Sequence, residues 1–86
     1  MFKVNNNIVF REVDDKIVLI NLESGFYYSL NECGRFVFNL LCDHLDLTEI
    51  IDKITAKYDV TENKVTKDLE QFIGNLELEN IVVRTA

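Results

Sequence analysis

The feature that most constrains this chain is a pair of strand-like segments joined by a glycine-containing turn. Residues 17–31 read Ile-Val-Leu-Ile-Asn-Leu-Glu-Ser-Gly-Phe-Tyr-Tyr-Ser-Leu-Asn. Glu23-Ser24-Gly25 fits a three-residue hairpin loop whose glycine takes the left-handed conformation. The residues after Asn31 have helical spacing instead, so one strand edge should lie beside helices. Such an edge can bind an extended peptide.

We predict three antiparallel strands in the first third of the chain. They are Ile8–Val13, Lys16–Leu22 and Phe26–Leu30, with Asp14-Asp15 as a tight turn and residues 1–7 as a loose lead-in. The apolar run Ile17–Ile20 places hydrophobic side chains on both faces of the second strand. Helices can cover one face. The other should be partly covered by the N-terminal segment, or should serve self-association or docking.

Three helices should follow, each preceded by a residue that suits an N-cap. The caps are Asn31, Asp46, which with Glu49 has the form of a capping box, and Thr61. The first helix should end near His44, and the second should span about Leu47–Tyr58. The apolar stripes of the three helices are Cys33, Phe36, Val37, Leu40 and Leu41, then Leu47, Ile50, Ile51, Ile54 and Tyr58, then Val65, Leu69, Phe72, Ile73 and Leu76.

This order of elements predicts an α+β fold in which helices pack on one face of a small antiparallel sheet. The second and third helices, joined by Asp59-Val60, make the arrangement winged-helix-like. A short apolar tail, Ile81–Val83, follows the third helix. The chain has no proline and no linker-like segment, so we predict a single domain over residues 1–86 with its core at about 8–83.

The charge balance limits the classes of partner. Nine Lys and Arg residues stand against fifteen Asp and Glu residues, which gives a net charge of -6 and argues against DNA, RNA and anionic membranes. The longest apolar run, Ile17–Ile20, is far too short to span a membrane, and the N-terminus lacks the apolar region of a signal peptide. We therefore expect a cytoplasmic protein.

The residue types that catalysis or metal binding requires are scarce. His44 is the only histidine, and Cys42-Asp43-His44 lacks the oxyanion loop and glycine-flanked nucleophile of a hydrolase. Interaction of His44 with the helix dipole is the simpler account. Cys33 and Cys42, nine residues apart on one helix, should point to opposite sides, which excludes a disulfide or shared metal. The three glycines are isolated, so no phosphate loop is present. We predict no catalytic residue, metal or cofactor.

Alternation along the third strand separates its side chains into two sets. Phe26, Tyr28 and Leu30 should face the helices, whereas Tyr27 and Ser29 should face away. Core packing accounts for the first set. An exposed tyrosine beside a free strand edge is a common peptide-contact residue, which makes Tyr27 a candidate.

The stretch Leu19–Asn31 resembles the PqqD-like family, the leader-recognition domains of ribosomally made, post-translationally modified peptides. Gly25, Tyr28 and Leu30-Asn31 carry the resemblance there. It covers the chain from Ile8 to Val83 and continues in order through Phe36–Leu41, Leu47–Ile51, Lys57–Val60 and Asp68–Ile73 with Leu76.

Two positions depart from the quinone-pathway proteins of this family. Cys42-Asp43-His44-Leu45 stands where an Asp-Gly is expected after the first helix. Asn80 replaces a glycine near the end of the third helix, and asparagine tolerates the left-handed turn. We therefore favour the wider family over the quinone pathway itself.

The resemblance implies a winged-helix-like fold without DNA binding, used to recognise a peptide. In the family, the leader of a precursor peptide adds as a strand to the third strand, beside the third helix. The domain then presents it to a separate enzyme, often a radical S-adenosylmethionine enzyme, or to a leader protease. We therefore predict a non-catalytic accessory protein whose peptide contacts are Phe26, Tyr27, Tyr28, Ser29, Leu30, Lys64, Asp68, Gln71, Phe72 and Asn75.

The polar residues of the third helix form two flanks beside its apolar stripe. The first flank is Thr61, Lys64, Asp68 and Asn75, and the second, which is acidic, is Glu62, Thr66, Glu70 and Glu77. If the second flank borders the peptide cleft, the leader should carry Lys or Arg. If the first does, charge should matter less.

Two other functions stay open on the sequence. A winged-helix DNA-binding regulator would place the third helix in the major groove, although acidic residues outnumber Lys64 and Lys67 on its polar face. A structural subunit or homodimer would instead use the outer apolar face of the second strand, around Val18 and Ile20.

Overall fold

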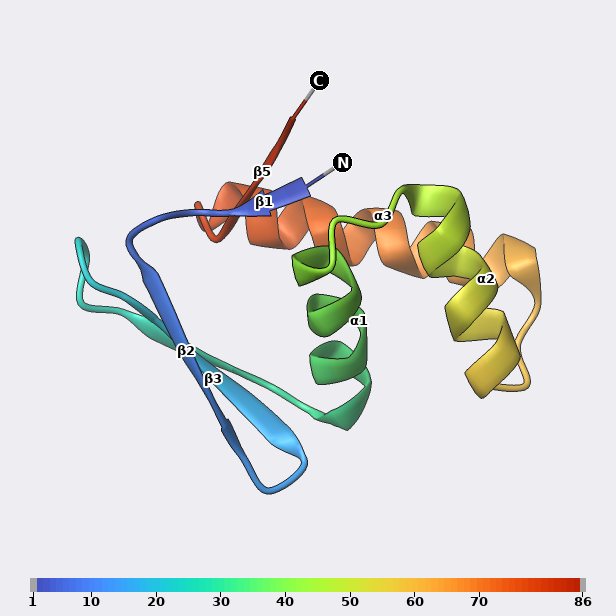
Figure 1. Cartoon of the computed structure of the whole chain (residues 1–86), viewed down its shortest axis with the longest axis horizontal. Helices are drawn as coiled ribbons and strands as arrows, with labels where there is room; N and C mark the ends of the chain where they lie inside the picture. Colours follow the sequence, from blue (N-terminus) through green and yellow to red (C-terminus); the bar gives the residue numbers. More distant parts are fainter. Residues whose placement is uncertain (1, 86) are drawn as a thin grey trace.

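A computed structural model describes residues 2–85 and confirms the α+β class, with a three-stranded antiparallel sheet followed by three helices (Figure 1). Met1, part of the predicted lead-in, lies outside these residues. In chain order the elements are β1 (Phe2–Val4), β2 (Ile8–Val13), β3 (Lys16–Asn21), β4 (Tyr27–Leu30), α1 (Glu32–Cys42), α2 (Leu47–Lys57), α3 (Glu62–Leu78) and β5 (Val82–Arg84).

The sheet has the order β2-β3-β4, so β3 is the central strand. Val13 pairs with Lys16, which leaves Asp14 and Asp15 as the predicted two-residue turn. Asp14 has a φ of 56°. Aspartate tolerates this left-handed conformation better than most residues do, which explains how Asp-Asp can form so tight a connection.

The loop between β3 and β4 comprises residues 22–26, two more than the predicted three-residue loop. Gly25 takes the predicted left-handed conformation, with a φ of 80°. The backbone N–H of Asn21 donates to the carbonyl of Phe26 at 2.9 Å and closes the loop. The Asn21 side-chain oxygen accepts the N–H groups of Glu23 and Ser24 at 2.9 and 3.1 Å. These side-chain bonds turn the chain away from the strand direction at Asn21.

The N-terminal segment is not a loose lead-in, and this prediction was wrong for the residues that the structure describes. Phe2–Val4 pairs with Val82–Arg84 in a separate two-stranded antiparallel sheet. Phe2 and Val82 are both buried in the core, with 3% and 1% of their surfaces exposed. Their burial stabilises the pairing, which brings the two ends of the described chain together (Figure 1).

The predicted N-caps of all three helices are confirmed. The side chains of Asn31, Asp46 and Thr61 each accept the backbone N–H three residues further on, at 2.9, 2.9 and 3.4 Å. Glu49 completes the capping box by accepting the backbone N–H of Asp46 at 3.4 Å. Each cap satisfies an N–H group that has no partner within its helix.

Two residues in the left-handed conformation end α1 and α3. His44 follows α1 with a φ of 60°, and Asn80 follows α3 with a φ of 58°. Beyond Asn80, the N–H of Ile81 donates to the carbonyl of Leu76 at 2.9 Å. This is the bond pattern of a Schellman motif, so asparagine fills the position expected for glycine.

Helix α1 lies between the sheet and α2 (Figure 1). On its sheet side Phe38 is fully buried and meets the ring of Phe10 edge to face, with centroids 5.3 Å apart. On its α2 side Phe36 packs edge to face on Tyr58 at 5.9 Å. Because α1 has neighbours on two sides, one apolar stripe does not describe it: Phe38 is buried outside the predicted stripe, whereas Cys33 within it is exposed.

The side chains of β4 follow the predicted alternation except at its start. Tyr28 and Leu30 pack against the core, whereas Tyr27 and Ser29 are exposed. Phe26 was predicted to face the helices, and this was wrong: it precedes the strand and is 67% exposed. The longer loop explains the difference, because Phe26 closes the loop instead of lying within the strand.

The outer face of the sheet carries one uncovered apolar row. The register places Val9, Ile20 and Tyr27 side by side across the three strands, and all three are exposed. The N-terminal segment does not cover them, because residues 2–4 pair with β5 instead.

Candidate functional site

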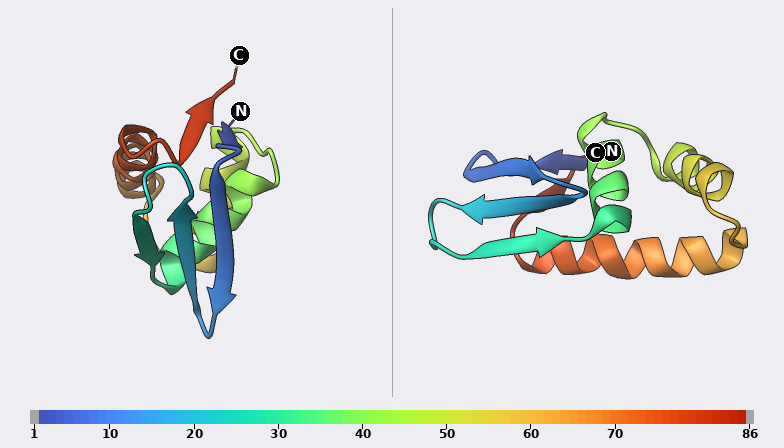
Figure 2. Two further views of the ribbon diagram at one scale, coloured as in Figure 1. Left: turned by 90° about the vertical axis from the view of Figure 1, so that its left-hand side faces the viewer. Right: turned by 90° about the horizontal axis from the view of Figure 1, so that it is seen from below.

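An apolar cleft lies between β4 and α3, and the first turn of α1 and the end of α2 close it. Its volume is about 560 Å³. Both views of Figure 2 show β4 as the strand of the three-stranded sheet that lies nearest α3. The cleft is lined by Ser29, Leu30, Asn31, Cys33, Gly34, Val37, Ile54, Tyr58, Val60, Lys64, Val65, Asp68, Leu69 and Phe72.

One edge of β4 is unpaired, and the register identifies its free backbone groups. Hydrogen-bonded and non-hydrogen-bonded pairs alternate along an antiparallel ladder. Because Asn21 bonds Phe26, the next hydrogen-bonded partners of β3 are Tyr28 and Leu30. The N–H and C=O groups of Tyr27 and Ser29 therefore point outward, toward the cleft side of the sheet.

The other free edge of the sheet, along β2, has polar surroundings. The Glu12 carboxylate accepts a hydrogen bond from the Asn39 amide at 3.0 Å and lies 3.7 Å from the Arg35 guanidinium. None of the three hollows described in residues 2–85 is lined by a residue of β2. The two edges thus differ: the one along β4 combines free backbone groups with an apolar cleft.

A hydrogen bond joins β4 to the C-terminal end of α3. The Tyr28 hydroxyl donates to the Glu79 carboxylate at 2.7 Å, near the end of the cleft opposite Lys64. This bond, followed by burial and by the Glu79 charge, raises the pKa of the Tyr28 phenol above its ordinary value. The phenol therefore stays protonated at neutral pH and keeps donating to Glu79.

The polar groups of α3 at the cleft belong to its first flank. Lys64 and Asp68 line the cleft and form an ion pair at 3.1 Å, with both side chains largely exposed. The acidic second flank does not line the cleft. One positive and one negative charge largely cancel, so this part of the cleft has little preference for the charge of a ligand.

At the α2 end, the cleft contains a cysteine beside a tyrosine. Cys33 is exposed, and Tyr58 belongs to both the cleft and the aromatic pair with Phe36. Burial, then the neighbouring charges of Cys33 and Glu32, raise the pKa of the Tyr58 phenol. Cys42, at the other end of α1, is half-buried, and burial followed by the charge of Asp43 raises the pKa of its thiol.

The predicted peptide contacts fall into three groups. Ser29, Leu30, Lys64, Asp68 and Phe72 line the cleft, and Tyr28 is held at its end by Glu79. Gln71 and Asn75 are exposed on α3 but do not line the cleft. Phe26 and Tyr27 are exposed on the loop and on the outer face of the sheet.

Sequence reasoning missed the contribution of α1 and α2 to the cleft. Three of the lining residues are Val37, Ile54 and Tyr58. Their place in the predicted apolar stripes indicated that they are buried, but not that they line a cleft. Gly34 gave no signal: a Cβ there would lie 3.1 Å from the Leu30 Cβ, so glycine allows α1 to begin close to β4.

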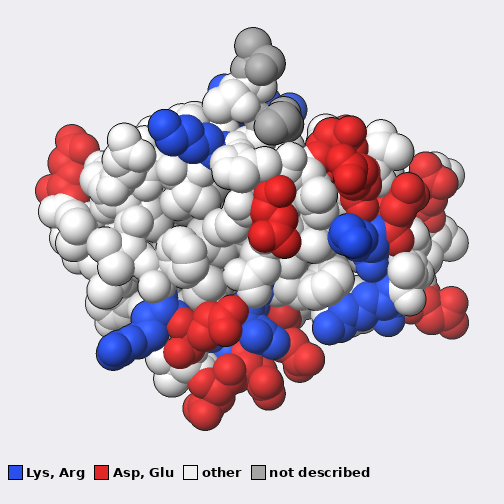
Figure 3. All heavy atoms as spheres, viewed as in Figure 1, with Lys and Arg blue, Asp and Glu red and all other residues white. Residues whose placement is uncertain are grey.

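Residues 2–85 lack the features of several other kinds of site. No group of three or more His, Cys, Asp or Glu residues in this part of the chain is arranged to hold a metal ion. Within the same residues, no helix has both the length and the apolar character that crossing a bilayer requires. On the face shown in Figure 3, Lys and Arg side chains are interspersed with Asp and Glu and form no continuous basic area.

Comparison with known proteins identifies the family. The family model described as coenzyme PQQ synthesis protein D (PqqD) matches residues 16–82. Because this match spans well over half of the 86 residues, the chain belongs to the PqqD family. A search of curated proteins found no match.

Two solved structures are similar to this chain over nearly its whole length. TbiB1 in complex with the TbiA(beta) leader peptide is 31% identical, with a TM-score of 0.92 and 98% of each chain covered. Lasso peptide synthetase B1 complexed with the leader peptide is 20% identical, with a TM-score of 0.90, 96% of this chain and 98% of that chain covered. The second likeness shows the fold alone.

Proposed function

We propose that this protein recognises the leader of a ribosomally made precursor peptide by adding it as a strand to β4. The observation that carries the proposal is the combination of a free β4 edge with an apolar cleft of about 560 Å³ beside it. The family and the similarity to TbiB1 in complex with the TbiA(beta) leader peptide support it.

The outward backbone groups of Tyr27 and Ser29 would supply the affinity. An added strand exchanges hydrogen bonds with these groups and so continues the ladder. Alternate side chains of the peptide then point into the cleft, where Leu30, Leu69 and Phe72 offer apolar surface. Burial of such side chains in the cleft would give sequence selectivity.

The bound leader would run antiparallel to β4, because antiparallel pairs are slightly more stable per residue. Strand β4 and helix α3 run in opposite directions: Leu30 lies with Lys64 at one end, and Tyr28 bonds Glu79 at the other. An antiparallel leader therefore enters at the Lys64 end and leaves at the Glu79 end (Figure 2).

We propose a single-domain, non-catalytic and cytoplasmic accessory protein that presents the leader to a separate enzyme. That enzyme would be a radical S-adenosylmethionine enzyme or a leader protease. Copurification of the chain with each candidate enzyme, with and without leader, distinguishes them.

A homodimer would use the outer row Val9, Ile20 and Tyr27. Sedimentation of wild type and Ile20→Asp over a range of concentrations tests whether it forms.

Calorimetric titration tests the proposed function. The leader peptide encoded beside this gene should bind the isolated chain, and the variant Phe72→Asp, which places a charge on the half-buried wall of the cleft, should bind much more weakly. Glu70→Asp is the matched control, because Glu70 lies on the same helix but is exposed and outside the cleft. Absence of leader binding by wild type, alone and with its cognate enzyme, would falsify the proposal.

A further inference from the structure

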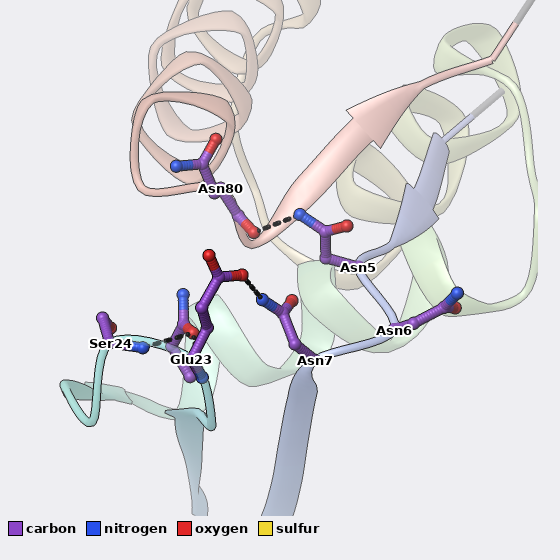
Figure 4. Close-up of a pocket in the computed structure, with 7 residues that line it drawn as sticks. Asn5, Asn6, Asn7, Glu23, Ser24 and Asn80 are labelled. Atoms are coloured by element: carbon purple, nitrogen blue, oxygen red, sulfur yellow. Dashed lines mark hydrogen bonds between the residues drawn. The ribbon is translucent and has the colours of Figure 1, made fainter.

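A second, polar hollow lies at the end of the molecule where β3 turns into β4. Its volume is about 720 Å³. Three segments meet there: the link between β1 and β2, the β3–β4 loop, and the residue that ends α3 (Figure 4). The hollow is lined by Asn5, Asn6, Asn7, Asn21, Glu23, Ser24 and Asn80. Glu23 is therefore the one charged side chain among its described lining residues.

Hydrogen bonds hold the three segments together. The side-chain amide of Asn5 donates to the carbonyl of Asn80 at 2.7 Å, and its backbone N–H donates to the carbonyl of Ile81 at 2.9 Å. The backbone N–H of Leu22 donates to the carbonyl of Asn7 at 2.9 Å. The walls of the hollow are thus fixed relative to one another.

These bonds leave one charged acceptor of the hollow free, the second oxygen of Glu23. The Asn7 amide nitrogen donates to one Glu23 oxygen at 2.8 Å, and a carboxylate can only accept, so the Asn7 oxygen must point the other way (Figure 4). That oxygen is buried without a donor. The Asn5 nitrogen is likewise committed to Asn80, and the Asn5 oxygen points away from Glu23 (Figure 4). The second Glu23 oxygen has no donor among the described residues.

A carboxylate oxygen without a donor, beside amide groups that can accept, suits a cation that carries several N–H groups. A guanidinium has five donors in a planar fork and pairs well with carboxylates, and an ammonium has three. Asn6 and Asn80 carry neutral amides that can accept as well as donate. The hollow therefore favours a basic side chain over an acidic or apolar one.

The position of the hollow indicates which part of a bound leader would reach it. A leader that pairs antiparallel with β4 leaves at the Glu79 end, and Asn80 is the next residue of the chain. Ser24 lies in the loop that directly precedes β4. The leader residues that directly follow the β-paired segment would pass the hollow.

Resting on the proposed function, we propose that the hollow binds an Arg or Lys side chain from the leader segment that follows the strand. The neutral Lys64–Asp68 pair at the entry end sets no charge preference, whereas Glu23 at the exit end does. Charge recognition of the leader is thus separated from the apolar cleft.

A double-mutant cycle tests this proposal by calorimetry with the leader peptide encoded beside this gene. Glu23→Gln keeps the acceptor for Asn7 but removes the charge, and in the peptide the basic residue after the paired segment is changed to Gln. Each change alone should weaken binding about fivefold. Together they should weaken it little further, because both remove the same contact. Glu70→Gln, an equal charge change on the exposed far flank of α3, should leave affinity unchanged.

The outcomes separate this proposal from the proposed function. Equal affinities of wild type and Glu23→Gln, or additive losses in the cycle, overturn the basic-residue site but leave leader binding intact. Tight binding of a leader with no Lys or Arg in the four residues after its paired segment overturns it as well. Failure of wild type to bind any leader overturns the proposed function and this inference together.

Discussion

Cys33 is the side chain through which occupation of the cleft can be followed chemically. It is exposed at the cleft wall, whereas the half-buried Cys42 has a thiol whose pKa is raised by burial and by Asp43. Since the thiolate is the reactive form, iodoacetamide should label Cys33 faster than Cys42 at pH 8.

Bound leader should protect Cys33 from labelling. With the leader at ten times its Kd, labelling of Cys33 should slow about tenfold, because about one molecule in eleven then has an empty cleft. Cys42 serves as the internal control, and its labelling should not change. Mass spectrometry of the two tryptic fragments gives both rates. Unchanged labelling of Cys33 at saturating leader would place the peptide elsewhere.

Some residue roles depend on geometry that the sequence does not contain. The caps at Asn31, Asp46 and Thr61 follow from local chemistry, so they were predictable. Asn21 was assigned to a strand, yet its side chain accepts two backbone N–H groups and it is only 7% exposed. An asparagine at the end of an apolar run is compatible with both roles, and only the folded loop distinguishes them.

At the scale of elements, the free edge of β4 carries the proposed function. Its outward backbone groups belong to Tyr27 and Ser29, whereas those of Tyr28 and Leu30 bond β3. The existence of this edge was predictable from the strand order. The shape of the cleft was not, because it also requires α1 and α2 to close one end.

Ser29→Pro should abolish leader binding and leave the fold intact. Proline removes an N–H that points outward, and it is tolerated on edge strands when the lost donor is not part of the ladder. Circular dichroism should stay native while calorimetry detects no binding. Ser29→Ala keeps the N–H and should bind as wild type does. Wild-type affinity for a folded Ser29→Pro would show that this N–H is not used.

At the scale of the whole molecule, pairing of β1 with β5 links the two ends of the described chain. Sequence reasoning treated the N-terminal segment as loose and residues 81–83 as a tail. Each segment is too short to show strand periodicity. The paired residues also lie about 80 positions apart in the sequence, so no local pattern predicts that they pair. The pairing matters for the hollow, because the segment that follows β1 forms part of its wall.

Phe2→Ala should therefore destabilise the whole protein. Phe2 is 3% exposed, and the Arg84 guanidinium lies 5.2 Å from the centre of its ring. Loss of a buried phenylalanine costs about 3 kcal/mol of unfolding free energy. Urea denaturation measures this loss of unfolding free energy. Lys3 is an exposed neighbour, and the control Lys3→Ala should change stability by less than about 0.5 kcal/mol. A Phe2→Ala protein as stable as wild type would contradict a structural role for β1.

The most direct test of leader addition at β4 is amide hydrogen exchange followed by NMR, with and without the leader peptide. The N–H groups of Tyr27 and Ser29 should exchange rapidly in the free protein and at least about tenfold more slowly in the complex, because the added strand bonds them. Those of Tyr28 and Leu30 already bond β3 and should change little. Unchanged exchange at Tyr27 and Ser29 in a saturated complex, or protection along β2 instead, would contradict strand addition at β4.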